Sequence, residues 1–143
     1  MKTYLIAYFA TLIAFVVVDF LWLSTMAGLL YRPTMGDMLA PSFRRTPAVV
    51  FYLLFAAGLI YLAVRPGLAS GSLWTAVLYG GVVGFTAYAT YDLTNQATLK
   101  NWSTILTVAD LAWGTILSAF ASGVGMWITE RILGPIGSTT ANS

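Results

Sequence analysis

Four apolar segments dominate the sequence, and each is long enough to cross a lipid bilayer as a helix. They cover about residues 3–30, 48–64, 72–95 and 102–132. A transmembrane helix needs about 20 apolar residues. Only 8% of the 143 residues are charged and the mean hydropathy is +0.81, whereas soluble domains are about 25% charged. We therefore predict an all-α membrane protein with a single domain, residues 1–133, that is a bundle of four transmembrane helices.

Two segments are expected to lie outside the helices. Residues 31–47 hold three of the five prolines, and proline removes a backbone donor and restricts the residue before it. This pattern predicts a proline-containing loop on the lipid headgroups between the first and second spans, with one or two helical turns at most. Residues 134–143 are small and polar and are expected to form a disordered tail. The first span exceeds the apolar core of a signal peptide, so a retained helix is expected.

Composition excludes several classes of function. The chain has no cysteine and no histidine, which removes disulfides, thiol catalysis and histidine-bearing haem or zinc sites. We therefore expect no cofactor and no metal. The net charge of +2 comes mostly from basic residues at helix ends, the usual arrangement in membrane proteins, so no nucleic-acid partner is expected. The basic residues divide three against four between the two sides, which leaves the orientation in the membrane undetermined.

Three of the five acidic residues, Asp19, Asp92 and Asp110, lie inside or at the edge of the apolar segments. A charged side chain at the centre of a membrane helix costs roughly 2.5–3.5 kcal/mol on insertion scales, and such residues usually mark a functional site. Short connections place the end of the first span, the end of the third and the start of the fourth on one side of the membrane. The three acids should therefore converge in one half of the bilayer.

Aromatic and polar residues accompany these acids at helical spacing. Trp22 and Trp113 each follow an aspartate by three residues, so each indole should cover the face of its own acid and offer an N–H donor. Gly80 and Gly84 fall on the same face as Asp92, which predicts close helix packing. Tyr52 is expected to be an interfacial anchor at one end of the second span. The candidate residues for binding or proton relay are Asp19, Trp22, Tyr88, Tyr91, Asp92, Thr94, Asn95, Asp110 and Trp113.

The run YDLTNQATL at residues 91–99, followed by Trp102, occurs together with a V-x-D-x-x-W pattern in the first span. This combination resembles a family of small four-helix bacterial membrane proteins catalogued as a domain of unknown function, and the resemblance covers nearly the entire chain. It implies the topology, and a place in the bacterial cytoplasmic membrane. Members of this family are associated with gene neighbourhoods that modify membrane fatty acyl chains, which points toward lipid. The motif residues map to Tyr91, Asp92, Thr94, Asn95, Thr98 and Trp102.

Three functional hypotheses remain open from the sequence. The leading one is binding or translocation of a proton, a cation or a polar lipid headgroup through the intramembrane aspartates. The second is a membrane-embedded enzyme that acts on lipid, with aspartates as general acid and base and Tyr91 or Asn95 orienting the substrate. The third is a non-catalytic partner of other membrane enzymes. A purely structural role, in which the acids lock the bundle together through tyrosine, threonine and tryptophan partners, also stays open. Membrane lipid is the expected partner in each case, together with a second copy of the chain or another membrane protein.

Overall fold

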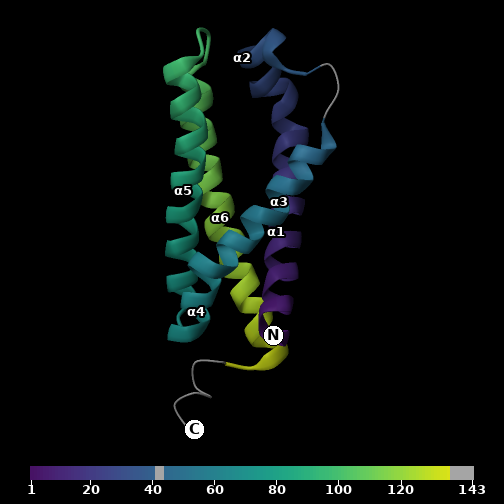
Figure 1. Cartoon of the computed structure of the whole chain (residues 1–143), viewed down its shortest axis with the longest axis vertical. Coiled ribbons are helices and arrows are strands. Elements are labelled where there is room, and N and C mark those ends of the chain that lie inside the picture. Colours follow the sequence, from purple (N-terminus) through teal and green to yellow (C-terminus); the bar gives the residue numbers. More distant parts are fainter. Residues whose placement is uncertain (41–43, 136–143) are drawn as a thin grey trace.

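Four helical runs are present in the computed structural model, which describes residues 1–40 and 44–135 (Figure 1). Each run is long and apolar enough to cross a membrane: Lys2–Met38, Arg45–Ser70, Leu73–Thr98 and Thr104–Leu133. The described residues contain no strand. The prediction of an all-α bundle of four transmembrane helices is therefore confirmed.

The first two runs are each built from several helical elements. The first consists of α1 (Lys2–Met26), the π-helical turn η1 (Ala27–Tyr31), α2 (Arg32–Met35) and the 3-10 turn η2 (Gly36–Met38). The second consists of α3 (Arg45–Leu59), the π-helical turn η3 (Ile60–Val64) and α4 (Arg65–Ser70). The other two are single helices, α5 (Leu73–Thr98) and α6 (Thr104–Leu133).

Both composite runs continue through a proline, so the connection between them is shorter than the sequence predicts. Pro33 and Pro66 each follow a π-helical turn, in which the N–H of Arg32 donates to the carbonyl of Ala27 and that of Arg65 to the carbonyl of Ile60. A proline ring normally clashes with the carbonyl four residues earlier. A preceding π-turn changes the position of that carbonyl and lets the helix proceed with a bend.

Parts of two predicted segments lie outside the described residues. These are residues 41–43 of the loop between the first two spans and residues 136–143 of the tail. In the described part of the chain, α6 ends at Leu133, and Gly134 follows with a φ of 83°. A residue with a side chain rarely adopts this backbone conformation.

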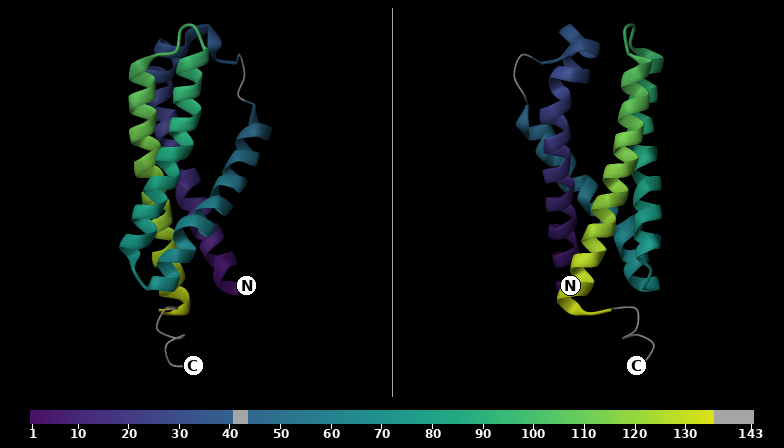
Figure 2. Two further views of the ribbon diagram at one scale, coloured as in Figure 1. Left: turned by 60° about the vertical axis from the view of Figure 1, so that its left-hand side comes forward. Right: turned by 180° about the vertical axis from the view of Figure 1, so that it is seen from behind.

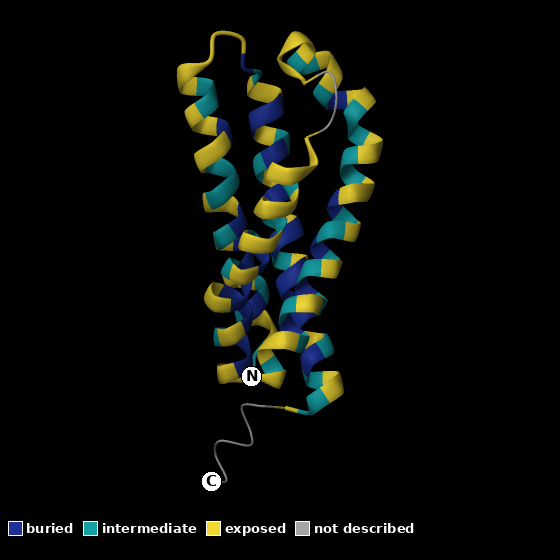
Figure 3. Ribbon diagram, turned by 45° about the vertical axis from the view of Figure 1, so that its right-hand side comes forward, coloured by how far each residue is buried: buried dark blue, intermediate teal, exposed yellow. Residues whose placement is uncertain are grey.

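The helices alternate in direction, and the start of α1 and the end of α6 lie at the same end of the bundle (Figure 1). α5 and α6 form the most extensive helix pair, and α1 packs on α6. α3 packs on α1, whereas the turn η3 that follows it packs on α5. The start of α3 consequently leans away from α5 and α6 (Figure 2). Exposed residues cover the outer faces of the helices (Figure 3), and many are large and apolar, as expected for contact with lipid.

Glycines bring α5 and α6 into close contact. A Cβ atom on Gly84 would collide with the backbone oxygen of Gly114 and the side chain of Ser118, and one on Gly80 would collide with Ser118 and Ser122. Buried Ala76, Gly80 and Gly84 of α5 follow at intervals of four residues, and Asp92 is buried eight residues further along the same face. The close contact therefore holds the carboxyl group of Asp92 toward α6.

We expect Gly84→Ala to destabilise the bundle by about 1–3 kcal/mol, because the added methyl group overfills a tight helix contact. The measurement is the thermal unfolding temperature in detergent. Gly58→Ala is the matched control, since nothing lies within 4 Å of a Cβ atom built on this glycine of α3. Equal unfolding temperatures for the two variants would contradict this account of the α5–α6 contact.

Candidate functional site

The structure brings Asp19, Asp92 and Asp110 into the same half of the bundle, at the end where α5 stops and α6 starts. Asp92 lies six residues before the end of α5 and Asp110 six residues after the start of α6, which is about 9 Å along each helix axis. Their exposed fractions are 7% for Asp19, 0% for Asp92 and 7% for Asp110. All three carboxyl groups are thus withdrawn from lipid into the protein.

Asp19 connects three helices through its two carboxylate oxygens. The hydroxyl of Tyr52 on α3 donates to Oδ2 at 2.6 Å, and the indole N–H of Trp113 on α6 donates to Oδ1 at 3.1 Å. Asp19 faces inward because it continues a buried row on α1 in which every fourth residue is buried. Hydrogen bonds to a charged group are among the stronger ones in proteins. Asp19 is therefore well supplied with donors from the protein itself.

Asp110 receives a different set of donors. The hydroxyl of Tyr31, in η1, donates to Oδ1 at 2.7 Å, and the indole N–H of Trp22 donates to that hydroxyl oxygen at 3.0 Å. The rings of Trp22 and Trp113 are stacked, with centroids 4.3 Å apart and an interplanar angle of 8°. This stack joins the hydrogen bonds of Asp19 to those of Asp110 in one network across α1, α3 and α6.

The hydrogen bonds of the two tryptophans differ from the sequence-based prediction. That prediction paired each indole with the aspartate on its own helix. Trp113 donates across the bundle to Asp19, and Trp22 reaches Asp110 only through the hydroxyl of Tyr31. The indoles still serve the carboxyl groups as donors. The exchange follows from the helix packing, because α1 and α6 lie side by side and their aromatic rings stack between them.

Asp92 stands apart from the other two acids. Its carboxyl group is completely buried, and neither oxygen accepts a hydrogen bond from an N–H or hydroxyl group of the described residues. The carboxyl group of Asp110 is close enough to act on it electrostatically. Two neighbouring carboxyl groups in a poorly solvated site repel each other when both are charged. The Asp92–Asp110 pair thus combines a buried carboxyl group that has no donor with a second acid beside it.

A cavity of about 300 Å³ lies beside this pair. Its lining combines one side chain from α3, three from α5 and one from α6: Phe51, Ala87, Tyr88, Tyr91 and Asp110. The ring of Tyr88 lies directly over Gly114, since a Cβ atom there would collide with the ring. The ring of Tyr91 meets that of Trp102 edge-on, with centroids 5.7 Å apart. The cavity is therefore a mostly aromatic space that Asp110 helps to line.

Two of the candidate residues do not join this network. The exposed hydroxyl of Thr94 donates to backbone carbonyls of its own helix, at Thr90 and Tyr91. Asn95 lies one turn beyond Asp92 at the end of α5 and is only partly buried. Asn95 belongs to the face predicted from the sequence, whereas Thr94 comes two residues after Asp92 and so lies about 200° around the helix from it.

Two tyrosines are important in the network and were not among the candidates. Tyr31 falls in the predicted loop, and Tyr52 is the residue expected to act as an interfacial anchor, yet both donate hydrogen bonds to buried aspartates. The sequence indicates the role of these two tyrosines only indirectly. Buried acids require donors, and a chain without histidine must supply them largely from tyrosine and tryptophan.

The charges of the cluster are not balanced by basic side chains. The donors that reach Asp19 and Asp110 in the described part of the chain are tyrosine and tryptophan groups, with no lysine or arginine among them. Among residues 1–40 and 44–135, no group of three or more acidic, histidine or cysteine side chains could hold a metal ion. The hydrogen-bonded acids of the cluster are therefore served by neutral donors.

Comparison with known proteins identifies a family. The family model described as "Predicted membrane protein (DUF2177)" matches residues 4–127, a range that includes all three aspartates. This match confirms the resemblance to a membrane protein family of unknown function. No match was found among curated proteins or among solved structures.

We expect Tyr52→Phe to destabilise the protein by roughly 1.5–3 kcal/mol, because it removes a hydrogen bond to a buried carboxylate. Chemical unfolding in detergent, followed by circular dichroism, measures the loss. Tyr79→Phe is the matched control, since this tyrosine of α5 is 45% exposed. Unfolding midpoints that agree for the two variants would show that the Tyr52–Asp19 bond contributes nothing to stability.

Proposed function

We propose a function for this chain, which belongs to the DUF2177 family of predicted membrane proteins: it reversibly binds a proton or a cationic group at the Asp92–Asp110 pair. The observation that supports the proposal is the state of Asp92, which is completely buried and receives no hydrogen-bond donor from the described residues. Leaving a buried carboxyl group without partners is costly. A positive charge that enters the site would remove this cost. We place the protein in the bacterial cytoplasmic membrane.

The contrast between Asp19 and Asp92 favours a binding site over a purely structural cluster. In a cluster that only ties helices together, each acid should receive donors from neighbouring helices. Asp19 fits that description, with donors on both oxygens from α3 and α6. Asp92 does not, although it is the most deeply buried of the three. We therefore assign a structural role to Asp19 and the binding role to Asp92 and Asp110.

The packing of the bundle limits what could pass beyond the site. Between α5 and α6 the contact at Gly80 and Gly84 has no room for even one additional carbon atom. The polar atoms there are the buried hydroxyls of Ser118 and Ser122, which have no hydrogen-bond partner among the described residues. Proton transfer needs a continuous chain of hydrogen bonds, which these hydroxyls do not form among the described residues. A proton or a larger ligand would therefore enter and leave by the half of the bundle that contains the acids.

We expect Asp92→Asn to remove a carboxyl group that exchanges its proton, while the protein remains folded and inserted. Infrared difference spectra of the protein in nanodiscs, recorded across a pH series, report the carboxylic acid C=O band. The groups that face this site from the packed elements are Asp19, Tyr31, Tyr52, Tyr88, Tyr91 and Asp110.

Asp37→Asn is the matched control, because Asp37 is an exposed acid in η2, outside the cluster. The wild type and Asp37→Asn should share a titrating band that is lost or clearly shifted in Asp92→Asn. An unchanged band in Asp92→Asn would refute the proposed role of this residue.

A further inference from the structure

The cavity beside Asp110 is larger and more aromatic than a site for a proton alone requires. Its volume is about 300 Å³, near the lower end of the range for small-molecule pockets. Three of its lining residues carry aromatic rings, Phe51, Tyr88 and Tyr91, and one is Asp110. A site for a proton alone has no need of this space or of these rings.

The rings of the cavity are held in place by other rings. Phe51 stacks on Phe55 with centroids 5.2 Å apart, and Tyr88 meets Phe55 edge-on at 6.5 Å. Phe55 thus connects the wall from α3 with the wall from α5. On the other side Tyr91 is fixed against Trp102. The aromatic wall is therefore formed before any ligand arrives, which lowers the entropic cost of binding.

The negative potential around this cavity favours binding of a cation over binding of an anion. The faces of aromatic rings carry negative potential and attract a cation within about 6 Å of the ring centre. Tyr31 donates to Oδ1 of Asp110, and no lysine or arginine of the described residues donates to this carboxyl group. An anion would be repelled by both features. A small metal cation prefers oxygen ligands to ring faces, whereas an organic cation suits the rings and the carboxylate together.

We propose that the site binds an ammonium group attached to an apolar chain, with the ammonium between the rings of Phe51, Tyr88 and Tyr91 and with Asp110 as its counter-ion. This inference rests on the proposed function and names the class of ligand for the same site. The ligand is either the ammonium headgroup of a membrane lipid or a free lipophilic amine, since the two share this chemistry.

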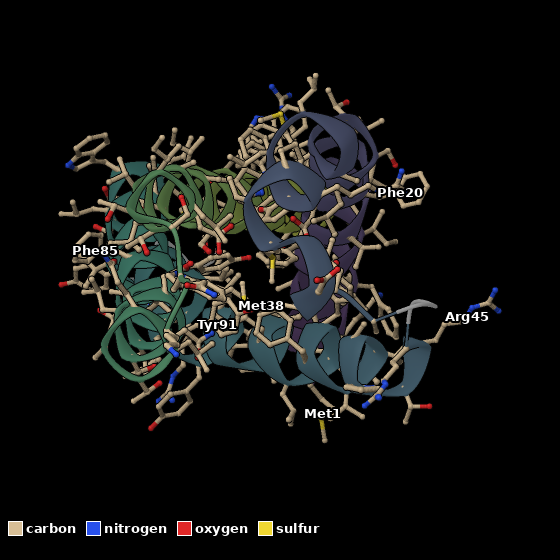
Figure 4. All side chains as sticks on the ribbon, turned by 90° about the horizontal axis from the view of Figure 1, so that it is seen from above. Met1, Phe20, Met38, Arg45, Phe85 and Tyr91 are labelled. Atoms are coloured by element: carbon tan, nitrogen blue, oxygen red, sulfur yellow. The ribbon has the colours of Figure 1, made fainter. Side chains whose placement is uncertain are left out.

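The position of the cavity fits a ligand that arrives from the membrane. Phe51 is 43% exposed and Tyr91 is 51% exposed, so the cavity is open at the outer surface between α3 and α5. The start of α3 leans away from α5 on this side (Figure 2). Seen from above, Tyr91 lies toward the middle of the bundle whereas Phe85, on the same helix, points outward (Figure 4). An ammonium group can enter while its apolar chain stays in lipid.

The test uses hexyltrimethylammonium, titrated by calorimetry into the protein in nanodiscs of phosphatidylglycerol. We expect Tyr91→Ala and Phe51→Ala to weaken binding about tenfold each, the size of one strong cation–π contact. Tyr91→Phe keeps the ring and should stay within about threefold of the wild type. The matched control is Phe85→Ala, which removes a 51% exposed ring of α5 outside the cavity and should leave affinity unchanged.

Charge is tested with two further probes of the same chain length, neutral hexanol and anionic hexyl sulfate. The inference requires that both bind at least tenfold more weakly than hexyltrimethylammonium. Equal affinity for hexanol would overturn it, as would equal losses in Tyr91→Ala and Phe85→Ala. Repeating the titration in phosphatidylglycerol nanodiscs that contain the same fraction of either phosphatidylethanolamine or an uncharged glycolipid separates the two sources, because the surface charge is then equal. Weaker apparent binding assigns the site to a lipid headgroup, and unchanged binding assigns it to a free amine.

Different experimental results would contradict the ligand class and the proposed function. A titrating carboxyl band that depends on Asp92, with no binding of hexyltrimethylammonium, would overturn the ligand class and leave the proton site standing. Loss of both signals in the folded wild type would overturn both proposals. Binding of hexyltrimethylammonium that is lost in Tyr91→Ala and restored in Tyr91→Phe supports the inference directly.

Discussion

The hydrogen bonds of Asp19 hold α1, α3 and α6 in one arrangement, and the aromatic cavity depends on them. In a membrane, apolar side chains gain little by leaving lipid for the protein, so polar bonds and close packing must specify which helices meet. α3 illustrates this dependence, because its first half leans away from α5 and α6 (Figure 2). The bond from Tyr52 to Asp19 anchors that half. Phe51 precedes Tyr52, so the same bond positions one wall of the cavity.

The two halves of the bundle are stabilised by different means, and the site follows from the difference. In one half, glycines of α5 lie against glycine and serine of α6, and the backbones approach too closely to leave space. In the other half, large rings and carboxyl groups replace the small residues and separate the helices. Tyr88 over Gly114 marks the change, since the glycine on one helix makes room for the ring on the other. The aromatic cavity lies in this second half, where large side chains of α3, α5 and α6 meet.

The sequence was sufficient to predict the four spans, the meeting of the three acids and the glycine contact, because each follows from hydropathy, short connections or a spacing of four residues. It was insufficient where the outcome depends on helix rotation or on local backbone adjustment. The path of the first helix through Pro33 depends on the π-turn before it, which moved Tyr31 from the predicted loop into the network. The contribution of Tyr52 depends on the direction in which α3 crosses α1. Thr94 belongs to the sequence motif, but it lies on the opposite side of the helix from Asp92 and its hydroxyl is bonded to its own helix.

The distribution of donors gives each acid a separate part in the proposed function. Two tyrosines and two tryptophans form the donor network, and all of it serves Asp19 and Asp110. Asp110 lines the cavity, whereas Asp92 is buried and interacts with Asp110. A cation in the cavity would therefore act on Asp110 directly and on Asp92 through the proton that the two carboxyl groups can share. If a proton and a cation both bind this pair as proposed, each would neutralise it, so arrival of the cation would favour departure of the proton. Under this proposal Asp19 would keep the helices fixed during the exchange.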